Sequence, residues 1–200
     1  MPDKNVIDLI AATHNEGKLK EFRHIAEGSR LVIRGLDAEL VKAAAEETGH
    51  SFDENALQKA RAVHVLTGGW VMADDSGLCV DALEGRPGIR TARYAGEDAR
   101  DEDNVRRLLE EMEEVPPGQR GAAFCCSLAV IGPGGGEKVY QGITRGEITR
   151  ERMGSGGFGY DPVFMPSGHE RTMAQMTAEE KNRLSHRGRA FRMFLEELER

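Results

Sequence analysis

The stretch "WVMADDSGLCVD", residues 70–81, decides the fold. It opens on a short apolar run, continues with the adjacent carboxylates Asp74 and Asp75, and returns to apolar residues after a serine and a glycine. Such bounded apolar runs are typical of buried strands. We therefore expect two short strands, 70–73 and 78–83, with the carboxylates delivered to a turn between them. Adjacent carboxylates repel each other unless a cation or donors compensate them, which makes this pair a candidate site.

The segments before this stretch alternate between strand and helix. Residues 5–12 and 30–36 are apolar runs that predict strands, and a helix with apolar residues at helical spacing lies between them and ends at Gly28. A second helix is predicted over 51–69, where Ser51 and Glu54 form a capping box and a glycine pair ends the helix. This order predicts an α/β protein.

The segments after it continue the sheet and close the chain with a helix. Residues 101–114 predict a helix that two prolines end, and "PGGG" (133–136) separates two long runs that predict an antiparallel hairpin. Thr177 and Glu180 form a second capping box ahead of a C-terminal packing helix. With 200 residues, the chain is expected to form a single domain over residues 1–200.

Composition excludes several classes of function. The chain carries 27 basic and 34 acidic residues, a formal net charge of −7, which argues against a general nucleic-acid-binding surface. No apolar run approaches the roughly 20 residues that span a bilayer, so no membrane partner is expected. Charges interrupt the first apolar segment, which is unlike a signal peptide, so a cytoplasmic location is expected. Cys79, Cys125 and Cys126 include no C-x-x-C, so they are interpreted as reduced strand residues.

Two loops are candidates for binding phosphate or a base. "THNEGK" (13–18) lies between a predicted strand and helix, where backbone N–H groups and Lys18 favour a phosphate, but it lacks the P-loop spacing. A capped turn with a solvated lysine is the alternative. "GSGGFG" (154–159) matches G-x-G-x-x-G, yet Pro162 and Pro166 exclude the helix that a dinucleotide site requires. It is either a glycine loop that lets the backbone approach a ligand or a plain surface loop.

Acidic residues and a histidine–arginine pair complete the candidates. Glu46 and Glu47 precede the second helix, and with one of the aspartates they would suit Mg²⁺, which prefers oxygen ligands and shares its shell with substrate phosphates. A solvated acidic face is the alternative. "SHR" (185–187) interrupts two helical stretches and supplies a guanidinium suited to carbonyl or phosphate oxygens.

Five ordered motifs together resemble one family across nearly the whole chain. They are "ATHNEGKLKEF" (12–22), "EETGHSFDENALQKARA" (46–62), "ADDSGLCVDALEGRPGIRTARYAG" (73–96), "GGFGYDPVF" (156–164) and "EEKNRLSHRGRAF" (179–191). They are similar to the successive signatures of the inosine triphosphate pyrophosphatase family, also called dITP/XTP pyrophosphatases. His14 departs from the glycine that many members have, and the "PGGG" tip is individual to this chain.

The resemblance implies a Mg²⁺-dependent enzyme that hydrolyses ITP, dITP and XTP to the monophosphate and pyrophosphate, which cleanses the nucleotide pool. It implies an α/β fold with a long mixed β-sheet flanked by helices, two lobes with a central active-site cleft, and usually a homodimer. Asp75 would be general base and metal ligand with Asp74 supporting it, and Glu46 would be the second ligand with Glu47 as its rival. Substrate would be bound by Thr13, His14, Asn15, Glu16, Gly17, Lys18, Lys59, Ser76, Phe158, Gly159, Tyr160, Asp161, Lys181, His186 and Arg187.

Two rival functions stay open at this point. A noncatalytic nucleotide-binding module would keep the phosphate loop and the base pocket but could lose the acidic residues, which this chain retains in "DDSG" and "EE". A Maf-like pyrophosphatase would hydrolyse other nucleotides and should lack "FGYDPVF" and "SHRG".

Overall fold

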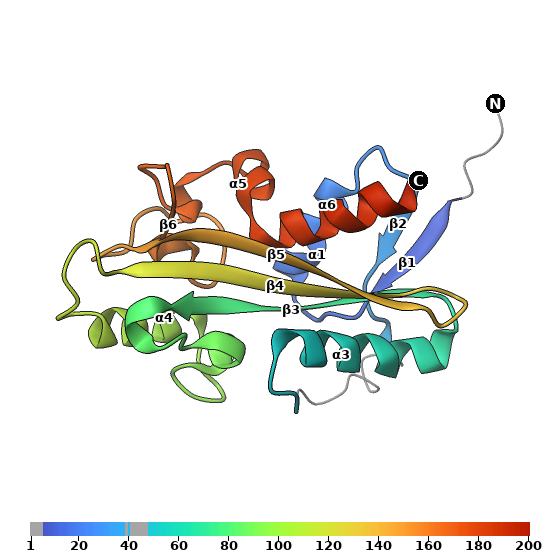
Figure 1. Cartoon of the computed structure of the whole chain (residues 1–200), viewed down its shortest axis with the longest axis horizontal. Helices are drawn as coiled ribbons and strands as arrows, with labels where there is room; N and C mark the ends of the chain where they lie inside the picture. The colour runs from blue at the N-terminus through green and yellow to red at the C-terminus, as the bar shows by residue number, and fades with distance from the viewer. Residues whose placement is uncertain (1–5, 39, 41–47) are drawn as a thin grey trace. The chain divides into compact units, whose positions relative to one another are not determined.

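A computed structural model describes residues 6–38, 40 and 48–200, and their strands form one mixed sheet in the order β2-β1-β3-β4-β5-β6. The strands are β1 (Ile7–Ala11), β2 (Leu31–Arg34), β3 (Trp70–Val80), β4 (Gly121–Ile131), β5 (Glu137–Ile148) and β6 (Phe164–Pro166). The helices are α1 (Glu16–Ile25), α3 (Phe52–Thr67), α4 (Asp101–Glu111), α5 (Ala178–Leu184) and α6 (His186–Leu198) (Figure 1). The predicted α/β fold with a mixed sheet is confirmed.

Strand directions follow from pairing and from close contacts at the strand ends. β1 runs parallel to both β2 and β3, whereas β5 and β6 are antiparallel. A Cβ built on Gly121, at the start of β4, would meet Asp81 just after β3, and one on Gly132, just after β4, would meet Trp70 at the start of β3. Each end of β3 therefore meets the opposite end of β4, so these neighbours are antiparallel.

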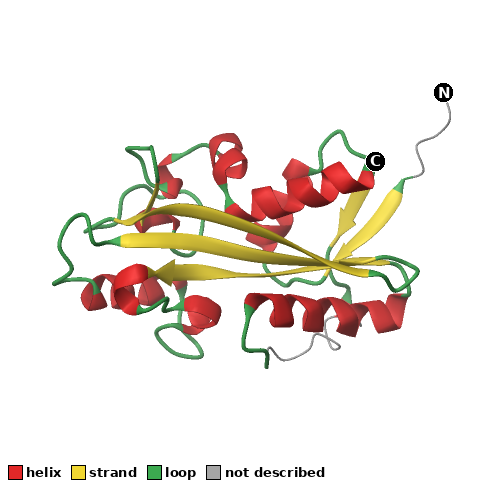
Figure 2. Cartoon of the chain, viewed as in Figure 1, coloured by secondary structure: helices red, strands yellow, loops and turns green. Residues whose placement is uncertain are grey.

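The central strand β3 differs from the prediction. It is one continuous strand of 11 residues rather than two short strands with a turn, and Figure 2 draws it without interruption. Asp74 and Asp75 therefore lie in mid-strand, where both are buried. A strand can hold adjacent buried carboxylates when cations and amide donors compensate them, and the site described below supplies both.

The described residues divide into two compact units. The first unit contains the residues up to Asp75, together with Cys126–Gly142 and Arg187–Arg200, and the second contains Ser76–Cys125 and Ile143–His186. The first boundary falls inside β3, directly after the two aspartates. The expectation of two lobes is thus matched by two compact units.

The first unit has a three-layer arrangement, with α3 on one face of the strands and α1 and α6 on the other (Figure 1). Successive residues of β3 point to opposite faces, so Met72 packs with Phe22 of α1 and Phe191 of α6, while Val71 packs with Ala60 of α3. The rings of Phe22 and Phe191 meet edge to face at 5.1 Å. The alternation of residues along β3 and the helical spacing of apolar residues in α1, α3 and α6 therefore place an apolar core on each face of the strands in the first unit.

The second unit has its own core, in which Leu78 and Val80 of β3 pack with Leu108 of α4 and Phe164 of β6. Buried Arg120, just before β4, donates from Nε to the carbonyl oxygen of Ile148, the last residue of β5, at 2.7 Å. Its other two nitrogens donate to the carbonyl oxygens of Met112 and Val115, which follow α4, and of Thr149, which follows β5. One guanidinium thus satisfies carbonyl groups at the ends of α4 and β5.

Most element ends match the sequence prediction, with local differences. Ser51 accepts from the Glu54 amide at 3.2 Å, but the Glu54 carboxylate accepts from the amide of His50 rather than from that of Ser51, so the capping box is shifted. Gly68 ends α3 in the left-handed conformation, as predicted. The segment after "GSGGFG" forms a 3₁₀ turn, 161–163, and then β6, which is consistent with its two prolines. Within the described residues, no helix has the length and apolar character to cross a membrane.

Candidate functional site

Seven residues of the first unit form two buried sets of charged and amide side chains around the adjacent residues Asp74 and Asp75 of β3, and the two sets together are called the ionic cluster here. Its members are Lys18, Glu21, Asn55, Lys59, Asp74, Asp75 and Arg187. They come from α1, α3, β3 and α6, four elements that the core of the first unit packs together. Five of them were predicted from the sequence: the structure places Lys18 and Arg187 at Asp74 and Lys59 at Asp75. Glu21 and Asn55, which were not predicted, complete the two sets.

Asp74 is the most buried carboxylate of the ionic cluster. Its Oδ2 lies 2.8 Å from Nζ of Lys18 and 3.3 Å from Nε of Arg187, and its side chain is 0% exposed. Burial by itself raises the pKa of this carboxyl, but the charges of Lys18, Arg187 and Lys59 outweigh that effect and hold the pKa well below its usual range. Asp74 is therefore an anion at every physiological pH.

Asp75 is oriented by two residues of α3. Oδ2 of Asp75 accepts from the amide of Asn55 at 3.0 Å, and Oδ1 lies 3.4 Å from Nζ of Lys59. Asn55 and Lys59 are four positions apart, so they lie on the same face of the helix. The two donors fix both carboxylate oxygens, which places the candidate base in a defined orientation.

Arg187 belongs to the ionic cluster through two carboxylates. It is 3% exposed, and it forms an ion pair with Glu21 of α1 besides its contact with Asp74. Burial lowers the pKa of the guanidinium, but the charges of Asp74 and Glu21 exceed this effect and raise it. The structure thus ties Arg187 to acidic side chains, while its predicted contact with the base stays a prediction.

The loop 13–18 opens α1, as the sequence predicts. Asn15 is the N-cap residue, since its Oδ1 accepts from the Lys18 amide at 3.0 Å, and its own amide donates to Oγ1 of Thr13 at 3.2 Å. His14 and Glu16 are exposed, whereas Gly17 and Lys18 are half-buried. The alternative of a solvated lysine is wrong, because Lys18 pairs with a buried carboxylate.

The second unit brings together the predicted base-recognition residues of the glycine loop and α5. Nζ of Lys181 lies 2.6 Å from Oδ2 of Asp161 and 4.4 Å from the centre of the Phe158 ring. The same Oδ2 accepts from the Phe158 amide at 2.9 Å. Lys181 and Asp161 are both buried. Together with the Phe158 ring, they place an ammonium, a carboxylate and an aromatic face next to one another.

The glycines of "GSGGFG" serve close approach between parts of the second unit. Gly157 has φ +73°, and a Cβ there would lie 2.1 Å from Oδ2 of Asp161. The Gly156 amide donates to the carbonyl oxygen of Ala174 at 3.0 Å. Gly159 donates to a carboxylate oxygen of Asp101, at the start of α4, at 2.7 Å. The loop is therefore held to neighbouring segments although residues 154–157 are exposed, and whether its backbone approaches a ligand stays a prediction.

The remaining predicted residues of the second unit are buried. The hydroxyl of Tyr160 donates to the carbonyl oxygen of Thr91 at 2.9 Å, and burial raises the pKa of that phenol. His186 stacks on Phe124 with ring centres 4.8 Å apart. Ser76 lies on β3 directly after Asp75 and is 9% exposed.

The predicted metal ligands are only partly within the described residues. Glu46 and Glu47 lie outside them. Among residues 6–38, 40 and 48–200, no three or more histidine, cysteine, aspartate or glutamate side chains are grouped so that they could hold a metal ion. The described donors that suit a hard cation are the paired carboxylates of β3.

Three residues of these groups were missed by sequence reasoning, although each carries a signal. Glu21 follows Lys18 by three positions and Asn55 precedes Lys59 by four, so both repeat a charged or polar residue on one helical face. Asp101 begins α4, where an acidic residue is ordinary because of the helix dipole. Its contact with the glycine loop carries no local signal.

The fold and the ionic cluster define an α/β protein whose mixed sheet carries paired carboxylates among buried cations. The Ham1 family model matches residues 9–197. A dITP/XTP pyrophosphatase of Bacillus subtilis is 44% identical, covering 96% of this chain and 97% of the relative, and one of Streptomyces coelicolor is 47% identical over 92% and 93%. The solved Ham1 protein of Staphylococcus aureus is 39% identical with a TM-score of 0.84, covering 96% of this chain and 98% of that one. The HAM1 protein of Coxiella burnetii is 36% identical with a TM-score of 0.86 and the same coverage. The chain belongs to the Ham1 family.

Proposed function

We propose that this protein is a nucleoside triphosphate pyrophosphatase that hydrolyses ITP, dITP and XTP to the monophosphate and pyrophosphate, and so cleanses the nucleotide pool of deaminated purines. The observation that carries the proposal is the likeness, over 92% or more of both chains, to relatives named dITP/XTP pyrophosphatase. The buried carboxylates and lysines support a hydrolase, because anhydride cleavage needs charge stabilisation at the phosphates and a base for water.

The triphosphate would bind at the loop 13–18 and the two lysines of the ionic cluster. The loop precedes α1, whose N-terminal amides and positive dipole end favour an anion. An ammonium carries three donors, so Lys18 and Lys59 can each contact a carboxylate and a phosphate oxygen together. Binding would therefore add to the existing ion pairs rather than replace them.

Asp75 is proposed as the general base. Asn55 and Lys59 each donate to one of its oxygens, which fixes the carboxylate plane. A carboxylate oxygen can accept more than one hydrogen bond, so a water molecule can donate to Asp75 as well. Asp74, anchored by Lys18 and Arg187, supports Asp75 by adding a second negative charge at the neighbouring position of β3. The attacking water would give its proton to Asp75 as the bond to the phosphorus forms.

Asp75 and Glu46, with Glu47 as the rival, would hold Mg²⁺. Carboxylates are the ligand type that Mg²⁺ prefers, and one or two of them suffice when substrate phosphates complete the shell. The described ionic cluster holds three carboxylates and three cationic side chains, so its formal charge is balanced and a dication is favoured only together with the negative triphosphate. When bound, Mg²⁺ would neutralise charge on the departing pyrophosphate and lower the pKa of the attacking water.

The base would be recognised in the second unit by Phe158 and its neighbours up to Asp161, with Lys181 and His186. The Phe158 ring offers a stacking face, and the Lys181 ammonium next to it is a donor for the oxygen at C6 of hypoxanthine or xanthine. Adenine carries an amino donor at C6, which would face this ammonium unpaired. A site that leaves buried donors unpaired can reject the wrong group by as much as about 10⁴-fold.

Residues 1–200 are proposed to act as one pyrophosphatase domain, since the family match runs through both compact units from residue 9 to residue 197. A homodimer and a cytoplasmic location also stay predictions of this proposal. The net charge of −7 supports the expectation that nucleic acid is not a partner. Sedimentation equilibrium of the purified chain tests the dimer.

The test of the function is pyrophosphate release with Mg²⁺ from ITP, dITP, XTP, GTP and ATP. We expect kcat/KM for the first three to exceed that for ATP by about 10² or more. Asp75→Asn should lower kcat for ITP by about 10² or more, the range for a lost acid–base group. Asp81→Asn is the matched control, because this exposed aspartate follows the same strand outside the ionic cluster, and it should retain wild-type activity.

The same assay separates the rivals. Binding of ITP without pyrophosphate release would identify a noncatalytic nucleotide-binding module. Efficient hydrolysis of nucleotides outside the deaminated purines would favour a Maf-like activity. Hydrolysis of ATP as fast as ITP would overturn the proposed base recognition, and wild-type activity of Asp75→Asn would remove Asp75 from the role of base.

A further inference from the structure

Two cysteines of the second unit lie in contact on neighbouring strands. Cys79 is on β3 and Cys125 is on β4, and their side chains are hydrogen-bonded to each other. Both thiols are free and only half-buried. Because β3 and β4 are adjacent and antiparallel, the contact is held by the sheet itself. Neither residue belongs to the proposed catalytic or binding residues.

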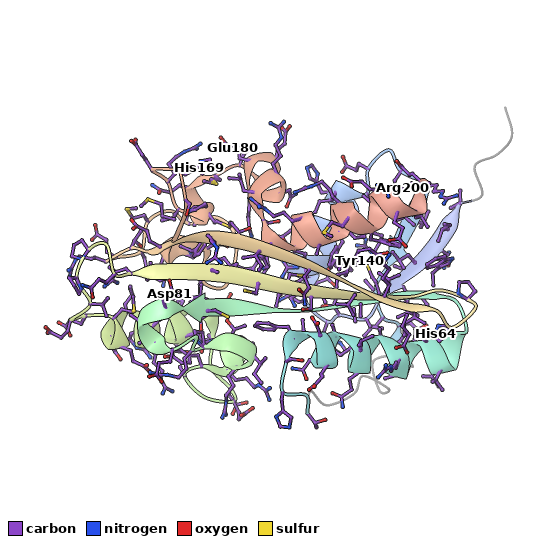
Figure 3. The ribbon with its side chains drawn as sticks, viewed as in Figure 1. His64, Asp81, Tyr140, His169, Glu180 and Arg200 are labelled. Atoms are coloured by element: carbon purple, nitrogen blue, oxygen red, sulfur yellow. The ribbon has the colours of Figure 1, made fainter. Side chains whose placement is uncertain are left out.

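The two thiols differ in their electrostatic surroundings. The hydrogen bond from Cys79 is the main cause that lowers the pKa of Cys125 to about 7, and the positive charge of Arg145 on β5 adds to it against the effect of burial. The pKa of Cys79 is raised by the same hydrogen bond, by burial and by the charges of Cys125 and Asp81, which follows β3 (Figure 3). Cys125 is thus the more acidic thiol of the pair and the one from which we expect the nucleophilic thiolate.

Cys126 provides an internal contrast. It is adjacent to Cys125 in sequence but is 2% exposed and packs in the core of the first unit. Burial, reinforced by the charge of Asp74, raises the pKa of this thiol well above its ordinary value. Neighbouring cysteines therefore have opposite reactivities, because successive strand residues point to opposite faces of the sheet.

We propose that Cys79 and Cys125 form an oxidation site that a hydroperoxide converts reversibly to a disulfide between β3 and β4. The Cys125 thiolate attacks a peroxide oxygen, the O–O bond breaks, and the released hydroxide takes a proton and leaves as water, so Cys125 becomes a sulfenic acid. The Cys79 sulfur then loses its proton and attacks the Cys125 sulfur, and the S–O bond breaks with release of a second water. Two thiols are oxidised by two electrons, and one molecule of hydrogen peroxide is reduced to two of water.

The pair has the features that such a site requires. A disulfide needs Cα atoms usually 4.4–6.8 Å apart, a range that residues paired across neighbouring strands have, and Cys79 and Cys125 lie on neighbouring strands. Half-exposure gives a small peroxide access to Cys125, and the contact supplies Cys79 as the resolving thiol without a large movement. A dithiol reductant would restore both thiols by exchange.

The test is peptide mapping of the full chain after treatment with hydrogen peroxide, blocking of remaining thiols and digestion with trypsin under nonreducing conditions. Cys79 lies between Arg61 and Arg90, and Cys125 lies between Arg120 and Lys138, so the disulfide joins two separate peptides. We expect this linked pair in the wild type, its loss on treatment with dithiothreitol, and its presence in Cys126→Ser. A linkage that requires Cys126, or no linkage at all, would overturn the proposal.

Two further measurements keep the proposal testable if a variant folds poorly. In the untreated wild type, iodoacetamide should alkylate Cys125 at least about tenfold faster than Cys126, as expected for a thiolate against a buried thiol. In Cys79→Ser, peroxide should leave a Cys125 sulfenic acid that dimedone traps, since the resolving thiol is absent. Equal alkylation of Cys125 and Cys126, or trapping at Cys126 instead, would contradict the assignment.

Discussion

Lys18 shows at the residue scale how one side chain can serve both folding and binding. Its ammonium lies 2.8 Å from Asp74, whose side chain is fully buried, and its own side chain is 16% exposed. A solvated lysine contributes little to stability, whereas removal of one partner of a buried ion pair leaves an uncompensated charge. Arg187 also contacts Asp74, so the loss of Lys18 would be partly offset.

We therefore expect Lys18→Ala to lower the free energy of unfolding by about 1–3 kcal/mol as well as impairing hydrolysis of ITP. Lys20→Ala is the matched control, since Lys20 is exposed on the same helix and should change stability by no more than about 0.5 kcal/mol. Urea denaturation of the three proteins at pH 7 gives the comparison. Equal stability of the two variants would show that the Lys18–Asp74 pair does not support the fold.

At the scale of the element, the glycine loop 154–159 depends on a backbone conformation and a close contact at Gly157 that a residue with a Cβ cannot adopt without strain. Gly157 combines a φ of +73° with a close approach to the Asp161 carboxylate, and that carboxylate in turn accepts from Phe158 and Lys181. A methyl group at position 157 would displace the carboxylate and break both contacts. The glycine loop and Lys181 of α5 are thus held together by the Asp161 carboxylate, to which both donate.

Gly157→Ala is expected to lower the free energy of unfolding by about 2 kcal/mol or more and to reduce kcat/KM for ITP, because strain in the left-handed region adds to the lost contacts. Gly134→Ala at the exposed hairpin tip is the control, since no atom lies within 4 Å of its added Cβ and its φ is not positive. Urea unfolding and ITP kinetics measure both effects. If the two variants unfold at the same urea concentration, position 157 tolerates a side chain and the close approach to Asp161 does not require glycine.

For the molecule as a whole, buried carboxylates determine the response to acid. The pKa of Asp74 is depressed in the folded state, so its contribution to stability is present above the pKa of an unfolded aspartate, about 3.9, and is lost as the pH falls below that value. The pKa of Glu180 is also lowered, to about 2, by its hydrogen bonds from Arg171 and the Thr177 amide, but that carboxylate is exposed and its ion pair is screened by solvent.

We expect the free energy of unfolding to fall steeply below about pH 4, with a slope approaching about 1.4 kcal/mol per pH unit for each proton taken up on unfolding. Glu180→Gln should follow nearly the same curve as the wild type, because the buried carboxylate dominates. Urea unfolding at half-unit steps from pH 3 to pH 7 supplies the curve. A flat profile down to pH 3 would mean that Asp74 is not held as a buried anion.

The sequence by itself determined the features that depend on neighbours along the chain. Strand alternation, helical spacing, the Thr177 cap and the Gly68 stop depend on local sequence, so most strands and helices apart from the course of β3 were predictable, while the mixed sheet was implied by the family resemblance. The motifs likewise indicate the family, and they contain Lys18, Lys59, Asp74, Asp75 and Arg187 of the ionic cluster.

Only the tertiary structure decided how buried charges are compensated. The aspartates looked like a turn because a strand interior rarely holds two carboxylates, but Arg187, 113 positions away from Asp74, and Lys18 from another helix make the continuous strand β3 possible. Glu21 and Arg187 are 166 positions apart, and no local pattern pairs them. The physical reason is that desolvation of a charge is local, whereas the opposite charge that offsets it can come from any segment that the core packs against it.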